Sequence, residues 1–176
     1  GINVIFFYGP DIFAKANLGV DTALFYTTLV GAMNIVFTIL AMRVIDRMGR
    51  KKLMLIGAAG MALCYLVIGY LFNPGRTDDW MLLAFILITP AFFAFGMGPT
   101  VWVVLSEIFP NKIRGAAMSV ATFALWVGCY TLTLTFPVFV EVLSTAVTFW
   151  IYSTVCLIGF AVIYKTLPET KGASLE

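Results

Sequence analysis

The sequence lacks histidine and is poor in charge, since charged residues make up only 11% of its 176 positions. An ordinary soluble domain has about a quarter of its residues charged, so this composition argues against one. Hydrophobic residues account for 61% of the chain, and the mean hydropathy is +0.99. The chain therefore belongs in a membrane, with the lipid bilayer as its surrounding. The net charge of +2 by itself argues neither for nor against nucleic acid, and we expect no nucleic-acid partner.

Signatures of enzymatic chemistry are missing as well. The sequence contains no zinc-binding pattern, no G-x-S-x-G elbow, no phosphate-binding loop and no pair of carboxylates that could form a site. Its three cysteines, Cys64, Cys129 and Cys156, fall within apolar stretches and lack the spacing of metal ligands. We interpret them as small core residues. An enzyme is not expected, nor is a metal site or a cofactor.

The sequence does contain a series of long uncharged stretches, each 21 to 27 residues long. A bilayer core of about 30 Å needs roughly 20 helical residues, so each stretch can cross the membrane once. Spanning β-strands would be about half as long and would alternate apolar with polar residues, which these continuous runs do not. The predicted fold class is all-α and polytopic, with complete spans at about 22–42, 53–73, 80–105, 115–139 and 144–165.

The charged clusters between these stretches predict the orientation of the spans. One set of alternate clusters holds nine Lys or Arg residues, whereas the opposite set holds only Lys15 and Arg76. Basic residues in short loops mark the cytoplasmic side. Residues 43–52 and 106–114 are therefore expected to be cytoplasmic loops, and residues 166–176 a cytoplasmic tail.

Residues 1–10 precede the first charge and can supply only about 15 Å of helix, which is half of a bilayer. The predicted orientation requires this segment to arrive from the cytoplasmic side. We therefore expect a partial span at 1–10, and we expect the natural protein to begin earlier than Gly1. With the partial span included, six spans form two groups of three.

The first span of each group carries a Gly-Pro pair, Gly9-Pro10 in one and Gly98-Pro99 in the other. Proline removes a backbone hydrogen bond and glycine loosens the helix, so both spans should bend or unwind there. Inside a bilayer, freed backbone groups are tolerated only against protein or a water-filled cavity. Matched interruptions in two repeats are typical of secondary transporters. The alternative is that each proline kinks its helix for packing alone, which is how we interpret Pro90 and Pro137.

Polar residues recur on one face of two spans, as expected for the lining of a path. They are Thr27, Gly31, Asn34 and Thr38 in the second span, and Ser119, Thr122, Trp126, Tyr130 and Thr133 in the fifth. Asn34 and Trp126 lie at mid-depth, and Asn3 is at a similar depth. Amides and aromatic faces suit a neutral polyhydroxylated ligand such as a sugar, and the spans contain no counter-charge for a charged one. For each asparagine, contact between helices is an equal alternative.

Four segments resemble, in this order, the motifs of the sugar porter family of the major facilitator superfamily. They are GINVIFFYG (1–9), DRMGRKK (46–52), GPTVWVVLSEIFPNKIRG (98–115) and PETKG (168–172). The resemblance covers the whole chain. It implies the C-terminal six-helix half of a twelve-helix fold, built of two inverted three-helix repeats, with the first helix truncated. The partner that it implies is the N-terminal six-helix half of the same protein.

The resemblance also implies roles for individual residues. The substrate-binding residues would be Asn3, Asn34, Trp102, Trp126, Phe93 and Gly98, the outer gate Phe7 and Tyr8, and the cytoplasmic latch Asp46, Arg50, Glu107 and Arg114. Leu125 and Cys129 depart from the polar residues that well-known members carry at these positions. One or two hydrogen bonds to the substrate, about 1 kcal/mol each, are therefore expected to be absent.

The function implied is transport of a neutral monosaccharide, a hexose or a pentose, by alternating access. Some members of the family couple transport to protons through an aspartate in the N-terminal half. The alternatives are a polyol or cyclitol carrier, slightly favoured by Leu125, and a non-transporting sugar sensor, for which the short tail offers no signalling extension. The expected location is the plasma membrane, and the lack of an N-x-S/T sequon is compatible with a bacterial inner membrane.

Overall fold

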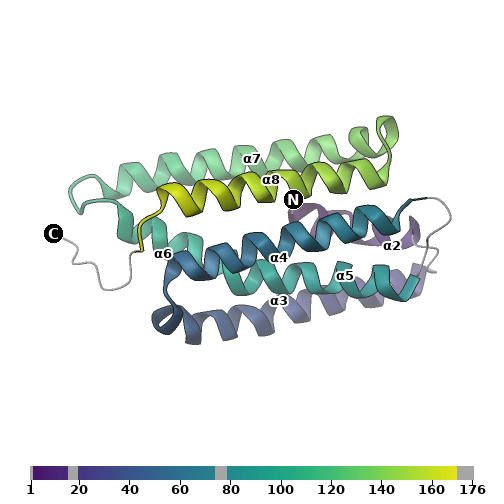
Figure 1. Ribbon diagram of the computed structural model, residues 1–176, viewed down its shortest axis with the longest axis horizontal. Coiled ribbons are helices and arrows are strands. Elements are labelled where there is room, and N and C mark those ends of the chain that lie inside the picture. The colour runs from purple at the N-terminus through teal and green to yellow at the C-terminus, as the bar shows by residue number, and fades with distance from the viewer. Residues whose placement is uncertain (1, 16–19, 74–78, 170–176) are drawn as a thin grey trace.

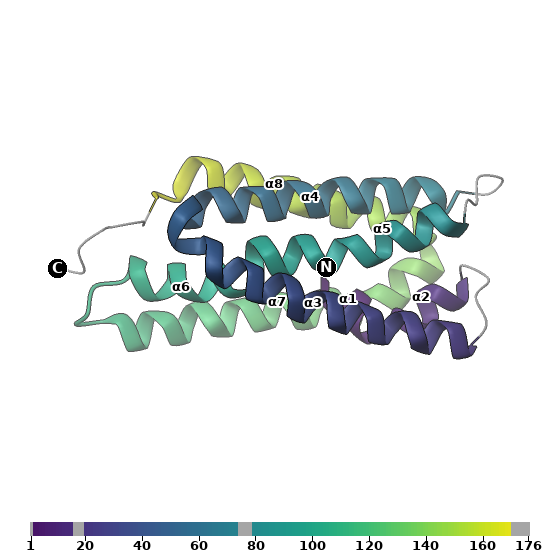
Figure 2. The same ribbon diagram turned by 90° about the horizontal axis from the view of Figure 1, so that it is seen from below.

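The computed structural model describes residues 2–15, 20–73 and 79–169, which form an all-helical bundle without a strand. The long helices lie side by side along the long axis of the bundle (Figure 1, Figure 2). The elements are α1 (Ile2–Phe7), α2 (Gly9–Lys15), α3 (Val20–Met48), α4 (Arg50–Leu71), α5 (Asp79–Phe92), the π-helical η1 (Phe93–Met97), α6 (Gly98–Ile108), α7 (Arg114–Val142) and α8 (Thr145–Thr166). The α3–α4 and α6–α7 turns and the end of α8 lie together at the left end of the bundle in Figure 1.

Five continuous helical segments are long and apolar enough to cross a membrane. They are Leu24–Met48, Arg50–Leu71, Trp80–Ile108, Arg114–Val142 and Thr145–Thr166. Each of the five complete spans predicted from the sequence overlaps one of these segments. The short helices α1 and α2 occupy the region of the predicted partial span.

Residues 43–52, predicted as a loop, are instead helical at every position except Gly49. Arginine and lysine are good helix formers, and their long side chains can carry charge out of an apolar surface, so a cluster of charge does not end a helix. The chain reverses at Gly49, whose φ of +91° is accessible to glycine because it has no Cβ. The junction of α3 and α4 is therefore a sharp corner rather than a loop.

The second predicted loop, 106–114, is also shorter than expected, because α6 continues to Ile108 and α7 begins at Arg114. The predicted tail, 166–176, begins where α8 ends at Thr166. Its residues 170–176 lie outside the described residues.

Both Gly-Pro pairs mark departures from regular α-helix, as predicted from the sequence. The first helix bends at Tyr8, between α1 and α2, although the Tyr8 and Ile12 amides still donate to carbonyls one turn back. In the second case α5 passes through η1 and resumes as α6 at Gly98. Short π-helical turns inside α-helices occur frequently at functional sites. By contrast, α-helix continues through Pro90 in α5 and through Pro137 in α7.

The central helix of the bundle is α4, which contacts α3, α5, η1, α6 and α8. Two of its glycines allow the end of α5 and η1 to come close. A Cβ on Gly57 would lie 2.9 Å from the Gly96 Cα, and a Cβ on Gly60 would overlap the Phe92 ring. Small residues let membrane helices approach until their backbones touch. This packing fixes η1, and with it the start of α6, against the middle of the bundle.

A cluster of aromatic rings joins the bend at Tyr8 to α7 and α8. The Tyr8 ring centroid lies 5.0 Å from that of Phe136 on α7. The Phe136 ring lies 6.4 Å from Phe149 and 6.4 Å from Tyr152, both on α8. Ring pairs at such distances contribute about 0.5–1.5 kcal/mol each beyond their buried area. The cluster therefore holds the first helix against α7.

Candidate functional site

Two adjoining cavities lie between the first helix and the later helices of the bundle. The first cavity, of about 520 Å³, lies between α1 and α7 and is lined by Asn3, Phe7, Tyr8, Trp126, Cys129, Tyr130 and Thr133. The second cavity, of about 320 Å³, lies between α1, α7 and the η1–α6 junction and is lined by Ile2, Asn3, Phe93, Met97, Gly98, Val101, Trp102, Leu125, Trp126 and Cys129. Both volumes fall within the ~300–1,000 Å³ of small-molecule sites.

The two cavities share three residues, Asn3, Trp126 and Cys129. Trp126 and Cys129 are three positions apart on α7, so they lie on one face of that helix. Asn3 faces them from α1, which contacts α7. A ligand placed at this shared wall would therefore reach into both cavities.

The two cavities differ in polarity. The first carries three hydroxyl groups, those of Tyr8, Tyr130 and Thr133, in addition to the Asn3 amide. In the lining of the second, Asn3 carries the one amide, none of the side chains has a hydroxyl, and two tryptophans add only indole N–H donors. The described linings of both cavities contain no charged side chain. They suit a neutral ligand that has both hydroxyl groups and C–H faces.

Most of the residues predicted to bind substrate come together here. Asn3, Phe93, Gly98, Trp102 and Trp126 all line the second cavity, although they belong to three separate parts of the chain. Phe7 and Tyr8, predicted as an outer gate, line the first cavity. The roles of these residues in binding and gating stay predictions.

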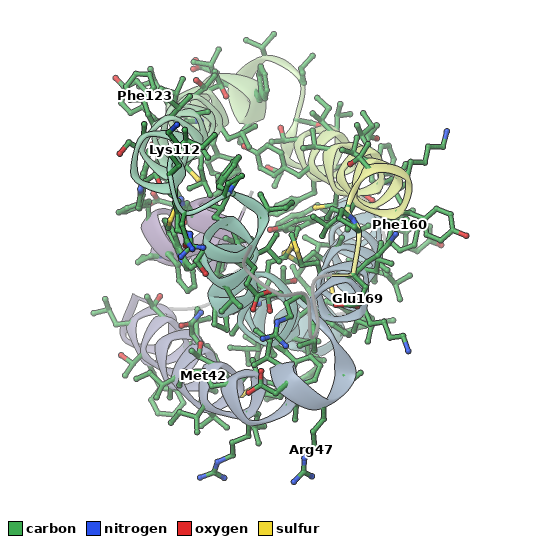
Figure 3. The ribbon with its side chains drawn as sticks, turned by 90° about the vertical axis from the view of Figure 1, so that its left-hand side faces the viewer. Met42, Arg47, Lys112, Phe123, Phe160 and Glu169 are labelled. Carbon is green, nitrogen blue, oxygen red and sulfur yellow. The ribbon has the colours of Figure 1, made fainter. Side chains whose placement is uncertain are left out.

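Asn34 lies apart from this group and lines neither of the two cavities. It belongs to α3, which packs against α2, α5, η1 and α6, whereas both cavities use α7 as a wall. In the end view of Figure 3, Met42 of α3 and Phe123 of α7 lie on opposite sides of the bundle. The polar face of α3 is therefore separated from that of α7 within this chain, and a binding role for Asn34 stays a prediction.

Cys129 departs from the interpretation of the three cysteines as small core residues, whereas Cys156 is partly buried and packs against the core. Cys64 is buried, in agreement with that interpretation, but Cys129 is only half-buried and lines both cavities. The usual burial of cysteine suggested a core position. The helical spacing instead indicates a position on the polar face of α7, because Cys129 is three residues after Trp126 and four before Thr133.

A cluster of charges lies at the end of the bundle where α3 meets α4. The Nε and Nη2 atoms of Arg50 lie 3.2 Å and 2.9 Å from the Glu107 Oε1 atom. Arg50 Nη2 also lies 3.0 Å from Asp46 Oδ1. The side chains of Arg50 and Glu107 are only 13% and 20% exposed, whereas that of Asp46 is 77% exposed. The cluster therefore joins α3, α4 and α6 through one partly buried guanidinium group.

Arg114, predicted as a fourth member of this cluster, takes a different position. Its Nε donates a hydrogen bond of 3.3 Å to the Phe109 carbonyl, and its Nη2 atom is buried without a hydrogen-bond partner among the described residues. Arg114 opens α7, and its bond to Phe109 spans the turn between α6 and α7. It therefore closes that turn instead of pairing with the acidic residues of the cluster.

Glu169 is a member of this charged end that the sequence analysis did not single out. Its Oε1 atom accepts a 2.9 Å hydrogen bond from the Arg50 backbone amide, at the first residue of α4. A carboxylate at a helix N-terminus satisfies a free N–H group and interacts favourably with the helix dipole. The PETKG segment was the sequence signal, because its glutamate lies three residues beyond the end of α8. Only the fold shows that this glutamate meets α4.

The contact between Glu169 and α4 depends on Gly49, which leads to a prediction. Gly49 has φ +91° and ψ 151°, and a Cβ added to it would lie 2.5 Å from Glu169 Oε2. We expect Gly49→Ala to lower the free energy of unfolding by about 1–3 kcal/mol, because this backbone conformation is nearly restricted to glycine. Thermal unfolding of the full-length protein in detergent measures the change.

The control for this prediction is Gly159→Ala on α8, where an added Cβ would meet nothing within 4 Å. That variant should unfold at the temperature of the parent protein or slightly above it. In the double variant Gly49→Ala/Glu169→Ala, the added Cβ no longer clashes with the Glu169 carboxylate. The double variant should therefore regain only the part of the unfolding free energy that this clash had removed. Equal stability of Gly49→Ala and the parent would show that the corner does not need glycine.

Comparison with known proteins places these features in a family. The family model described as Sugar (and other) transporter matches residues 1–176. The chain is 38% identical to the arabinose-proton symporter of Bacillus subtilis over 176 residues, which are 100% of this chain and 38% of that protein. It is also 38% identical to the D-xylose-proton symporter of Escherichia coli over 182 residues, which cover 100% of this chain and 37% of that protein.

A solved structure gives the same result. The proton:xylose symporter XylE of the major facilitator superfamily, from E. coli, in a complex with 6-bromo-6-deoxy-D-glucose, superposes with a TM-score of 0.89 and is 38% identical. The match covers 99% of this chain and 38% of that one. The chain thus spans less than two fifths of the length of these relatives.

Proposed function

Because the chain belongs to the sugar transporter family of the major facilitator superfamily, we propose that it forms part of a membrane carrier that moves a neutral monosaccharide by alternating access. The observation that carries this proposal is the wall shared by the two cavities. Asn3 and Trp126 face each other there, an amide and an indole, in linings without a charged side chain. Hydroxyl groups can pair with the amide, and the C–H face of a sugar ring can pack on the indole.

The arrangement favours transport rather than chemistry on the bound sugar. The proposed site contains neither a carboxylate pair nor a metal-ligand cluster among its described residues. The relatives of this chain that are named above are transporters. It also lies beside the two interrupted helices, where a change in helix direction would open or close it. We therefore propose a carrier rather than an enzyme, with Phe7 and Tyr8 closing the site from the outside.

The partner that completes the site would be a second six-helix half of the same protein. The relatives are more than twice as long as this chain. Among the described residues, α7 buries only Phe136, and large apolar side chains on α3 and α7 are exposed. They include Phe25, Ile35, Val36, Val120, Phe123 and Leu134. We propose that the other half covers part of these faces and that lipid covers the rest.

The charges at the left end of Figure 1 support a proposed orientation in the membrane. Arg47, Lys112 and Glu169 lie on the α3–α4 corner, the α6–α7 turn and the segment after α8, and Figure 3 views this end. Basic residues gather on the cytoplasmic side of a membrane protein. We propose that this end and the C-terminus face the cytoplasm, in the plasma membrane and specifically in a bacterial inner membrane.

We further propose that Asp46, Arg50 and Glu107 form a cytoplasmic latch, with Arg114 supporting the turn beside it. The Arg50–Glu107 pair joins α4 to α6, and α6 is the continuation of the interrupted span. Such pairs contribute about 1–3 kcal/mol when charged hydrogen bonds are partly buried, which can bias two conformations of similar free energy.

The substrate class is a hexose or a pentose, and both proton-coupled relatives carry pentoses by name. The rival functions are a polyol or cyclitol carrier and a sensor that binds sugar without moving it. Uptake of labelled D-xylose, L-arabinose, D-glucose and myo-inositol into proteoliposomes containing the full-length protein separates these functions. Running the assay with and without an inward proton gradient shows whether transport is coupled.

We expect uptake of a monosaccharide that is recovered chemically unchanged. Preferential uptake of myo-inositol would favour the cyclitol carrier, and saturable sugar binding without uptake would favour the sensor. Failure to bind or transport any of these compounds would refute the proposed function.

A further inference from the structure

The second cavity has a wall that offers almost no hydrogen bonds. Leu125 and Cys129 lie four residues apart on α7, and Met97 and Val101 lie four residues apart across the η1–α6 junction. Residues at this spacing share a face of a helix. None of the four side chains contains an oxygen or nitrogen atom, and the cysteine thiol is only a weak donor and acceptor.

The hydrogen-bonding groups are concentrated on the other side of the shared wall. Tyr8, Tyr130 and Thr133 supply three hydroxyls to the first cavity, and Asn3 lies between the two cavities. The Thr133 hydroxyl donates to the Cys129 carbonyl at 2.8 Å, so its oxygen remains as an acceptor for a ligand hydroxyl. A ligand that spans the shared wall therefore meets hydroxyls on one side and an apolar wall on the other.

We propose that this carrier selects a deoxy sugar, a monosaccharide that turns a methyl or methylene carbon, rather than a hydroxyl-bearing carbon, toward Leu125, Cys129 and Met97. This inference rests on the proposed function and goes beyond it in naming the substrate class. A hydroxyl group placed against this wall would lose its hydrogen bonds to water and gain none, whereas a methyl group would bury apolar surface. The expected discrimination is about tenfold for each such hydroxyl.

Competition assays with matched pairs of sugars test the proposal in the full-length carrier in proteoliposomes. The pairs are D-glucose with its 2-, 3- and 6-deoxy analogues, D-galactose with 6-deoxy-D-galactose, and L-mannose with 6-deoxy-L-mannose. Each compound competes with uptake of whichever labelled monosaccharide the carrier transports. We expect at least one deoxy sugar to compete about tenfold more strongly than its parent.

A change in the wall should reverse the preference. Leu125→Asn places an amide at the apolar wall, so it should strengthen competition by the parent sugar relative to its deoxy analogue by about tenfold. The matched control is Leu134→Asn, nine residues or two and a half turns further along α7, where the side chain points to the opposite side. Leu134 is 58% exposed, and the control should leave the ratio unchanged. If Leu125→Asn fails to fold, Cys129→Ser adds a hydroxyl with little change in shape.

The possible failures are distinguishable. If monosaccharides are transported but every parent sugar competes as well as its deoxy analogue or better, the deoxy-sugar inference is wrong and the proposed function stands. If no monosaccharide binds or is transported, both are wrong. If the preference is found but neither Leu125→Asn nor Cys129→Ser alters it, the assignment to this wall is wrong.

Discussion

Replacing Trp126 with alanine in the full-length carrier should weaken sugar binding by about 30-fold or more, corresponding to ~2 kcal/mol. Trp126 is 57% exposed, yet it lines both cavities and lies one helical turn from Cys129. Loss of its ring removes the aromatic surface on which a sugar would pack, at one of the three residues that line both cavities. The concentration dependence of uptake in proteoliposomes, together with direct binding of a labelled sugar, measures the effect.

The matched control is Trp80→Ala, which removes the same side chain from the start of the third long span. Trp80 is 77% exposed and lines neither cavity. This variant should bind sugar within about twofold of the parent, and both variants should reach the membrane in equal amounts. Unchanged binding in Trp126→Ala would mean that the shared wall is not the sugar site.

Replacing Glu107 with glutamine should slow transport by about tenfold while leaving sugar binding measurable. The substitution keeps the shape of the side chain but removes the charge that accepts two hydrogen bonds from Arg50. Arg50 then keeps its ion pair with the exposed Asp46. Weakening the latch shifts the balance between conformations, so the turnover rate should fall more than the affinity.

Asp46→Asn is the comparison that separates a latch from a general effect of charge. This substitution also removes a carboxylate charge that pairs with the Arg50 guanidinium. Asp46, however, is 77% exposed, so its ion pair is open to solvent. Exposed pairs contribute about 0–1 kcal/mol, so turnover should fall by less than about fivefold. Turnover rates that fall equally in both variants would indicate that the burial of the Arg50–Glu107 pair is irrelevant to transport.

The charged end also shows how one glycine connects several parts of the fold. Arg50 contacts Glu107 through its side chain and Glu169 through its backbone amide. The two glutamates come from α6 and from the segment after α8, so both later parts of the chain are fixed to the start of α4. Gly49 permits this because its missing Cβ leaves room for the Glu169 carboxylate. A change at the corner is therefore expected to affect the latch as well as stability.

The sequence by itself determined the spans, the class of fold and the positions of the two interruptions. A helix that crosses a membrane must be long and apolar, and both properties are local to each stretch of chain. The Gly-Pro pairs act locally too, because proline lacks an N–H group wherever it occurs. For the same reason the sequence placed Asn3, Asn34 and Trp126 at similar depths. It could not show whether helices separated by a hundred residues face one another.

Tertiary structure alone decided which residues meet. The contact of Gly57 with Gly96 sets η1 against α4, and it leaves α3 on the far side of η1 and α6 from α7. Asn34 is consequently outside the two cavities, while Cys129, which the sequence had assigned to the core, lines both. Glu169 meets Arg50 across 119 positions in sequence. The position and rotation of each helix depend on all of its neighbours at once, and no single span carries that information.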